Sequence, residues 1–234
     1  MIYGFIIAAG KQSRFNSDIP KALSVVGDKT LLDINLSRLR RVCDRIFVVC
    51  SKENKDYFNG DYEKIVIKSG LGCGDAVLKA IGLLNIDDPK DTCFVQWGDS
   101  FVDSKLYKEM ISQYNGKWVI PCELIDNPYV QIVPGDGRIK AVFSKYGEKT
   151  DRGLHDLSVF YGSMLKFKNM ALLFRYNTFN GKVYNHKHGN EFQFLDIFND
   201  TSLGAIAYET QYKGYSFNTV DELNDIVRKL GEDA

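Results

Sequence analysis

The chain has 234 residues, of which 44% are hydrophobic and 26% are charged, so it is long enough to bury a substantial core. Thirty basic residues balance thirty acidic ones, which excludes a generally basic nucleic-acid-binding surface and an acidic tail. No apolar stretch reaches the roughly 20 residues that cross a bilayer, so we expect a cytoplasmic protein with no membrane or nucleic-acid partner.

The first expected element is an apolar strand that ends in a glycine turn. Ile2–Ala8 reads IYGFIIA, a run with β-branched members that suits a strand covered on both faces. Gly10 follows it, and the cations Arg14 and Lys21 come soon after. Backbone N–H groups of such a turn, reinforced by these cations, favour a polyphosphate ligand. An ordinary glycine turn with a few surface cations fits the same pattern, which contains neither the dinucleotide fingerprint nor the P-loop.

Strands and helices then alternate along the first half of the chain. We expect strands at Arg45–Cys50, Glu63–Ile67 and Thr92–Gln96, with helices that begin near Thr30 and Gly74. This alternation predicts right-handed βαβ units and a mainly parallel sheet. Ligands of such sheets bind beyond the carboxyl ends of the strands, so the turns that follow these strands should meet on one side.

After Pro121 the pattern changes to short strand-like runs separated by glycine, aspartate and proline, which predicts antiparallel strands. The expected strands are Tyr129–Val133, Ile139–Phe143, Leu157–Tyr161 and Leu203–Ala207, and the expected helices are Lys166–Arg175 and Phe192–Phe198. No linker marks a boundary, so we expect one domain over residues 1–234.

Gly72 and Cys73 lie in a glycine-rich turn just before the second expected helix. Such a bend can surround a flat base with backbone groups, and Asp75 in the first helical turn suits the helix dipole. A flexible strand-to-helix connection is the alternative, because glycine clusters are common in turns.

Two oxygen-bearing side chains are candidates for a metal site. Asp99 follows a buried strand within the sequence W-G-D, so it should project at the ligand edge of the sheet. Mg²⁺ is typically held by one or two protein oxygens plus phosphate oxygens, which suits a carboxylate beside a triphosphate. Thr219 and Glu222 form a capping box for a last helix, and Asn218 stands just before it. Turn or capping roles for Asp99 and Asn218 are the alternatives.

These motifs resemble those of the nucleotidyltransferases that make activated sugars and alcohols. They are I-A-A-G-K-Q-S-R at residues 7–14 with P-K at 20–21, W-G-D at 97–99 and F-N-T-V-D-E-L at 217–223. The chain is most similar to the uridylyltransferase domain that acts on N-acetylglucosamine 1-phosphate and to bacterial cytidylyltransferases. The resemblance implies a three-layer α/β/α sandwich with a mainly parallel mixed sheet, of the nucleotide-diphospho-sugar transferase, GT-A-like type.

The resemblance also implies a reaction, in which an acceptor phosphate attacks the α-phosphorus of a nucleoside triphosphate with Mg²⁺ and releases pyrophosphate. It implies that Arg14 and Lys21 hold the phosphates and that Asp99 and Asn218 bind the metal. The nucleotide-binding positions that it implies are Ala8, Ala9, Gly10, Lys11, Gly72, Cys73 and Gly98. Residues 122–208 would contribute much of the acceptor side, with Ser144, Lys145 and Ser158 as candidate contacts.

Departures from the family pattern concern both substrates. Ile67 stands where the sugar enzyme has a base-reading glutamine, and Ser144 and Ser158 stand where it has glutamate and asparagine. We therefore expect an acceptor other than N-acetylglucosamine 1-phosphate. We expect a pyrimidine triphosphate, with CTP slightly ahead of UTP, because the chain is compact and has no acyltransferase extension. Surface-polysaccharide or lipid-headgroup synthesis is the usual context of such enzymes, and a homodimer remains open.

Three other readings remain open. A GT-A-type glycosyltransferase usually has D-x-D, whereas the residue two after Asp99 is Phe101. A guanylyltransferase that serves a molybdenum cofactor shares the first loop but normally has more glycines there. A catalytically inactive sensor could keep nucleotide binding without turnover.

Overall fold

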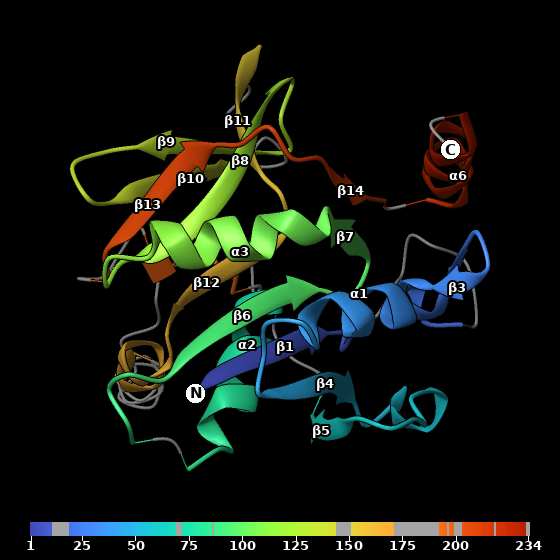
Figure 1. Cartoon of the computed structure of the whole chain (residues 1–234), viewed down its shortest axis with the longest axis horizontal. Helices are drawn as coiled ribbons and strands as arrows, with labels where there is room; N and C mark the ends of the chain where they lie inside the picture. The colour runs from blue at the N-terminus through green and yellow to red at the C-terminus, as the bar shows by residue number, and fades with distance from the viewer. Residues whose placement is uncertain are drawn as a thin grey trace.

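This computed structural model describes residues 1–10, 19–68, 72–85, 87–143, 151–170, 192–195, 197–198, 203–217 and 219–232. Figure 1 shows one sheet between layers of helices. Within the described residues the sheet has ten strands, some parallel and some antiparallel. The predicted three-layer α/β/α architecture is confirmed.

The parallel half of the sheet brings two strand ends together. β1 (Ile2–Ile7) lies between β4 (Arg45–Ser51) and β6 (Thr92–Trp97) and is parallel to both. Ile7 at the end of β1 is in register with Trp97 at the end of β6. Because parallel strands end at the same edge of a sheet, the turns that follow β1 and β6 are neighbours.

The second half of the sheet is antiparallel, as the sequence predicts. Its strands are β8 (Trp118–Asp126), β9 (Val130–Pro134), β10 (Ile139–Phe143), β11 (Arg152–Asp156) and β12 (Val159–Ser163). They follow the order β10-β9-β11-β8-β12 and reach the parallel half where β12 pairs with β6. Two strands complete the sheet: β5 (Glu63–Ile67) is parallel to β4, and β13 (Ala205–Glu209) is parallel to β8.

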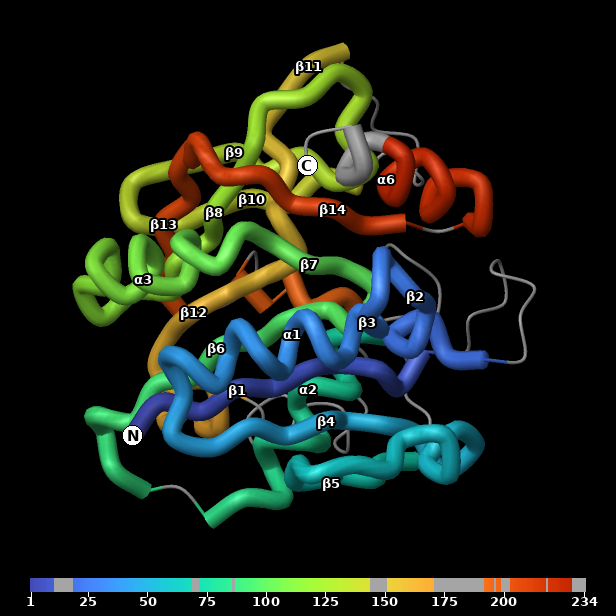
Figure 2. The backbone as a smooth tube through the Cα atoms, turned by 45° about the vertical axis from the view of Figure 1, so that its right-hand side comes forward, coloured from blue at the N-terminus to red at the C-terminus, as the bar shows by residue number. Residues whose placement is uncertain are grey.

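Helices cover both faces of the sheet, and Figures 1 and 2 show them on opposite sides. α1 (Leu31–Leu39) and α3 (Ser104–Gln113) pack on one face against apolar side chains of β4 and β6. α2 (Cys73–Gly82) packs on the other face together with helical residues 164–170. Two apolar cores, one on each face, therefore hold the sheet between the helical layers.

The C-terminal helix α6 (Val220–Glu232) begins with the predicted capping box. Glu222 N donates to Thr219 Oγ1 at 3.2 Å, and Thr219 N donates to Glu222 Oε2 at 3.3 Å. Leu223 and Ile226 then pack in a small third core with side chains that include Phe217. This packing ties the last helix to the edge of the sheet where the parallel strands end.

Several elements were not anticipated from the sequence. They are α3, β8, β11, β7 (Ser100–Val102), β14 (Gly214–Ser216), β2 (Val25–Val26), β3 (Lys29–Thr30) and the 3₁₀ turns Lys21–Leu23 and Lys55–Tyr57. β7 and β14 form a separate antiparallel pair, and so do β2 and β3. These two- and three-residue strands depend on a partner strand, because they are too short to show a period of their own.

Two expected helices agree with the structure only in part. Residues 192–193 have no regular secondary structure and residues 194–195 form a turn, whereas residues 197–198 are helical. In the expected helix Lys166–Arg175, residues 166–170 are helical and the rest lie outside the described part of the chain. Among the described residues, no helix is long and apolar enough to span a membrane.

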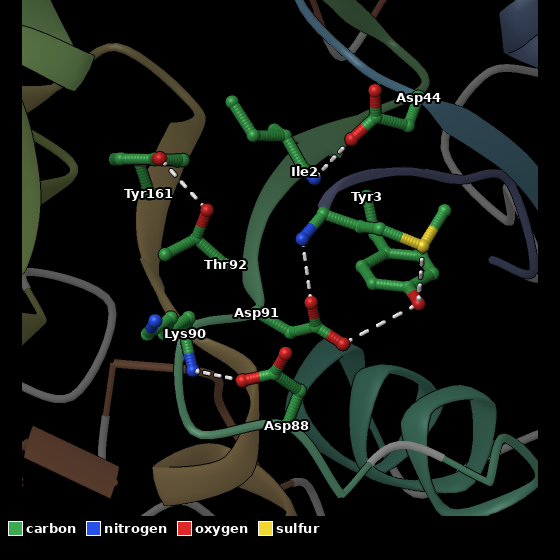
Figure 3. Close-up of polar contacts among 9 residues, drawn as sticks. Ile2, Tyr3, Asp44, Asp88, Lys90, Asp91, Thr92 and Tyr161 are labelled. Atoms are coloured by element: carbon green, nitrogen blue, oxygen red, sulfur yellow. Dashed lines mark hydrogen bonds and ion pairs between the residues drawn. The ribbon is translucent and has the colours of Figure 1, made fainter.

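A cluster of polar contacts lies at the edge of the sheet where the parallel strands β1 and β6 begin (Figure 3). Asp91 is 5% exposed, and its Oδ1 lies 2.6 Å from the amino nitrogen of Met1. Its Oδ2 accepts a hydrogen bond from the Tyr3 hydroxyl at 3.5 Å. The hydrogen bond to Asp91 raises the pKa of the Met1 amino group above its ordinary value of 8.0. Asp91 therefore ties the start of β1 to the start of β6.

We expect Asp91→Ala to lower the free energy of unfolding by about 1 to 2 kcal/mol, because it removes a buried acceptor of two hydrogen bonds. Since folding raises the pKa of the Met1 amino group above 8.0, this contribution is full below that pH and declines as the pH rises through the folded-state pKa. Urea titrations of protein beginning at Met1, at neutral and alkaline pH, measure both effects.

The control for this experiment is Asp87→Ala, because the Asp87 side chain is 89% exposed and its ion pair with Lys168 contributes little. Equal losses of stability in the Asp91 and Asp87 variants would contradict the structural role of Asp91.

Candidate functional site

The turn after β1 begins with two buried alanines and an exposed glycine. Ala8 N donates to Val49 O at 2.8 Å, and Ala8 O accepts from Asn54 Nδ2 at 2.8 Å. The backbone N–H and C=O of Ala8 therefore each make a hydrogen bond within the protein. Ala9 and Gly10 follow Ala8 in the turn. Sequence reasoning missed Asn54, since a lone asparagine after a strand carries no pattern.

Gly10 has no steric requirement within the described part of the molecule. A Cβ added at Gly10 would meet no atom within 4 Å, and its φ is not positive. The expected reason for this glycine, close approach of the backbone to a ligand, therefore stays a prediction. The other predicted residues of this loop, Lys11 and Arg14, lie outside the described residues.

The turn after β6 packs directly against the turn after β1. Gly98 N donates to Ile7 O at 2.9 Å. A Cβ added at Gly98 would lie 3.0 Å from Ile7 O, 3.2 Å from Ala22 Cβ and 3.3 Å from Ala8 Cβ. Glycine at this position lets the two turns touch, and the next residue, Asp99, has a side chain that is 38% exposed.

Lys21 connects the W-G-D turn to a segment near the C-terminus. It is 7% exposed, and its Nζ donates to Phe217 O at 3.1 Å and lies 3.5 Å from Asp99 Oδ2. The same ammonium lies 5.8 Å from the centre of the Phe217 ring. The negative charge of the Asp99 carboxylate and the Phe217 carbonyl oxygen both stabilise this buried ammonium.

Pairing of β7 with β14 explains why the C-terminal segment returns to this place. Ser216 at the end of β14 is in register with Ser100 at the start of β7, and the two strands are antiparallel. The chain beyond Ser216 therefore runs back toward Asp99. Asn218, the second predicted metal ligand, lies outside the described residues, although its neighbour Phe217 contacts the Lys21 ammonium.

The glycines of the turn before α2 are accounted for by packing within the protein. Gly72 has a φ of +113°, and a Cβ there would lie 2.5 Å from Phe192 O. Gly74 N donates to the same oxygen at 3.0 Å. Cys73 Sγ donates to Gln193 Oε1 at 3.3 Å. The predicted contact of Gly72 and Cys73 with a base therefore stays a prediction, and the glycines have a structural reason that does not involve one.

The segment 192–194 also reaches the W-G-D turn. Phe194 N donates to Cys73 Sγ at 3.3 Å, and the Phe194 ring meets the Trp97 ring edge-on at 5.5 Å between centres. This segment thus connects the turn before α2 with the turn after β6. The expected helix at Phe192–Phe198 does not begin here because these backbone groups bond to the turn before α2.

Ser158 lies beside the W-G-D turn, at the junction of β11 and β12. Its backbone O accepts from Trp97 N at 3.0 Å, and its N donates to Asp156 Oδ1 at 2.9 Å. Its φ of +63° is unusual for a residue with a side chain and typically marks a functional or over-determined position. The expected strand Leu157–Tyr161 accordingly begins only at Val159. Ser144 and Lys145 lie outside the described residues.

The described residues that could contribute to a metal site are few. They contain no group of three or more His, Cys, Asp or Glu side chains suited to a metal ion. Asp99 is the predicted ligand among them, and a single carboxylate suits Mg²⁺, which keeps several waters and phosphate oxygens in its coordination sphere. The site is thus compatible with a metal that arrives with a polyphosphate.

We expect Gly98→Ala to lower the free energy of unfolding by about 1 to 3 kcal/mol, because its Cβ would push the two turns apart. Gly10→Ala should leave stability unchanged or raise it by up to about 1 kcal/mol, because alanine restricts the unfolded chain and meets no described atom. Urea denaturation of the two variants beside the wild type measures the difference. Equal effects at the two positions would contradict the close packing at Gly98.

Comparison with known protein families matches residues 4–142 to a model described as the MobA-like NTP transferase domain. Among curated proteins, the bifunctional protein GlmU of Ruthia magnifica subsp. Calyptogena magnifica is 29% identical over 150 residues, which cover 60% of this chain and 32% of GlmU. The chain thus spans about a third of the length of the curated relatives that it matches.

Solved structures share the fold over nearly the whole chain. HddC from Yersinia pseudotuberculosis has a TM-score of 0.69 and 18% identity, over 98% of this chain and 100% of HddC. LicC from Streptococcus pneumoniae, a CTP:phosphocholine cytidylyltransferase, has a TM-score of 0.71 and 14% identity, over 98% of this chain and 99% of LicC. HddC has also been solved with GMP-PN. At sequence identities this low, these structural matches show a shared fold alone.

Proposed function

The chain belongs to the MobA-like NTP transferase family, and from that premise we propose that it transfers a nucleoside monophosphate to a small phosphorylated acceptor. The acceptor phosphate attacks the α-phosphorus of a nucleoside triphosphate, the bond to the bridging oxygen breaks, and pyrophosphate leaves. The observation that carries the proposal is the Lys21 ammonium, which lies 3.5 Å from Asp99 Oδ2 and 3.1 Å from Phe217 O. Two motifs far apart in the sequence thus share one buried cation.

We assign the phosphate-binding role to the loop after β1 with Arg14 and Lys21. Phosphoryl-type transfer needs little covalent chemistry from the protein, so positioning and charge neutralisation provide most of the rate enhancement. A lysine and an arginine near the departing pyrophosphate would stabilise the charge that it gains. No nucleophilic side chain is required.

Mg²⁺ is the proposed cofactor, with Asp99 and Asn218 as its protein ligands. The fit rests on the chemistry of the donors, because a carboxylate and a carboxamide supply the oxygen atoms that Mg²⁺ prefers. When bound, the ion neutralises charge on the phosphate oxygens of the triphosphate. The location of Asp99, in the turn beside the first loop, supports this assignment, since Gly98 N bonds to Ile7 O.

For the nucleoside, we propose contacts along the edges of the two turns and the start of α2. The residues are Ala8, Ala9, Gly10, Lys11, Gly72, Cys73 and Gly98. Because the Ala8 N–H is already bonded to Val49 O, Ala8 would contribute van der Waals contact and the second lone pair of its carbonyl oxygen. A pyrimidine is proposed, with CTP ahead of UTP, and the fold shared with the CTP-dependent LicC supports CTP as the first triphosphate to test.

Residues 122–208 are proposed to supply the acceptor side, with Ser144, Lys145 and Ser158 as contacts. The position of Ser158 supports this, because its carbonyl bonds to Trp97 N beside the W-G-D turn. Serine is shorter than the asparagine that the amino-sugar enzyme has at this position. The acceptor is therefore a phosphorylated small molecule other than N-acetylglucosamine 1-phosphate.

An assay of pyrophosphate release tests the proposal. ATP, GTP, CTP and UTP are each combined with Mg²⁺ and with N-acetylglucosamine 1-phosphate, glucose 1-phosphate, inositol 1-phosphate or phosphocholine. We expect release with a pyrimidine triphosphate and an acceptor other than N-acetylglucosamine 1-phosphate. Equal or better turnover of the amino sugar would refute the acceptor assignment. Nucleotide binding without release from any combination would favour an inactive sensor.

Removing either charge of the Lys21–Asp99 pair should reduce turnover strongly. We expect Asp99→Asn and Lys21→Met each to lower kcat by about 100-fold or more, because each removes a group that acts on the developing charge. Steady-state kinetics with the productive substrate pair measure the effect. Asp87→Asn is the control, since its side chain is 89% exposed and lies outside the proposed contacts. Near-normal turnover in either of the first two variants would overturn their assignment.

A further inference from the structure

A buried polar network lies beneath the W-G-D turn, on the face of the sheet that α1 and α3 cover. Its four side chains come from four different elements. They are Asn35 of α1, Gln96 of β6, Ser100 of β7 and Tyr107 of α3, and each is at most 1% exposed. None of these residues belongs to the proposed nucleotide, acceptor or metal contacts.

Gln96 is the centre of the network. Its Nε2 donates to Ser100 Oγ at 2.8 Å, and its Oε1 accepts from the Tyr107 hydroxyl at 3.2 Å. The amide of Gln96 therefore connects the turn with α3. Burying a primary amide is costly unless both of its ends are bonded, and here both ends are.

Ser100 closes the turn that contains Asp99. Its Oγ donates to Trp97 O at 3.0 Å, across Gly98 and Asp99. Its backbone O accepts from Asn35 Nδ2 at 2.8 Å. The residue before the turn is held as well, because Trp97 N donates to Ser158 O at 3.0 Å. The turn is thus fixed at both ends, and the Asp99 side chain extends from between them.

We propose that Gln96, Ser100 and Tyr107 are positioning residues that fix the Asp99 carboxylate for metal binding, an inference that rests on the proposed function. Apolar side chains could fill this volume at a lower desolvation cost than an amide, a serine and a phenol. The polar side chains add directional hydrogen bonds, which hold the turn that contains Asp99 in one conformation. Groups that orient metal ligands typically affect metal affinity or activity about 10- to 100-fold.

The fold contains a matched pair of tyrosines for testing this. Tyr107 and Tyr161 both pack on Phe94, with ring centres 5.3 Å and 4.4 Å away. Each hydroxyl bonds to a polar side chain of β6: Tyr107 to Gln96 at 3.2 Å and Tyr161 to Thr92 at 2.8 Å. Figure 3 shows the Tyr161 contact at the start of β6. The two contacts are roughly 13 Å apart along an extended strand.

The experiment compares Tyr107→Phe with Tyr161→Phe in the full chain. Mn²⁺ is titrated into each protein, alone and with CTP, and binding is followed by water proton relaxation. We expect Tyr107→Phe to weaken Mn²⁺ binding about tenfold and Tyr161→Phe to leave it unchanged. Both variants should lose a similar few degrees in Tm, because each loses one buried hydrogen bond. CTP affinity without metal should be equal in the wild type and both variants.

Ser100→Ala provides a second, independent variant, because it removes the hydroxyl that closes the turn. It should also weaken Mn²⁺ binding, and the double variant with Tyr107→Phe should lose less than the product of the two effects, since Tyr107 acts through Gln96 on the same Ser100 hydroxyl. Equal Mn²⁺ affinities in Tyr107→Phe and Tyr161→Phe would overturn the positioning role.

Asp99→Asn separates this inference from the proposed function. If it abolishes Mn²⁺ binding while the two tyrosine variants behave alike, the metal site stands and the positioning role is wrong. If it leaves Mn²⁺ binding unchanged, the proposed metal site is wrong and the positioning role falls with it.

Discussion

The contact between the turn after β1 and the turn after β6 is the constraint on which the candidate site depends. Parallel pairing ends both strands at the same edge, and Gly98 lets the second turn approach Ile7 O and the side chains of Ala8 and Ala22. A side chain at residue 98 would push the turn that contains Asp99 away from Ile7 and Ala8 at the end of β1. The position of Asp99, the proposed metal ligand, therefore depends on the lack of a side chain at Gly98 as well as on attractive contacts.

A second constraint is the return of the chain near its C-terminus. The β7–β14 pair carries Ser216 back to Ser100, and the Lys21 ammonium then contacts both Phe217 O and Asp99. Lys21 belongs to the 3₁₀ turn Lys21–Leu23, Asp99 extends from the turn above the buried network under β6, and Phe217 packs in the small core at α6. Three separate parts of the fold thus meet at one charge, and a shift of any of them would change the distance between cation and carboxylate.

The glycines in the turn before α2 allow close packing within the protein. Glycines at 72 and 74 leave room for residues 192–194, which bond to the turn through backbone and thiol groups. Phe194 then contacts Trp97, so the segment supports two turns of the proposed site at once. A glycine-rich sequence indicates close approach, but it does not say whether the approaching group is a ligand or another part of the same chain.

By itself the sequence determined the parallel half of the sheet, the antiparallel character of the second half, the capping box of α6 and the placement of Asp99 at the edge of the sheet after β6, because each depends on local periodicity or turn chemistry. Only the tertiary structure decided the pairing of β7 with β14, the non-helical conformation of residues 192–195 and the network around Gln96. These features are made by contacts between segments distant in the chain, and a three-residue strand or a lone buried amide has no local pattern to indicate its partner.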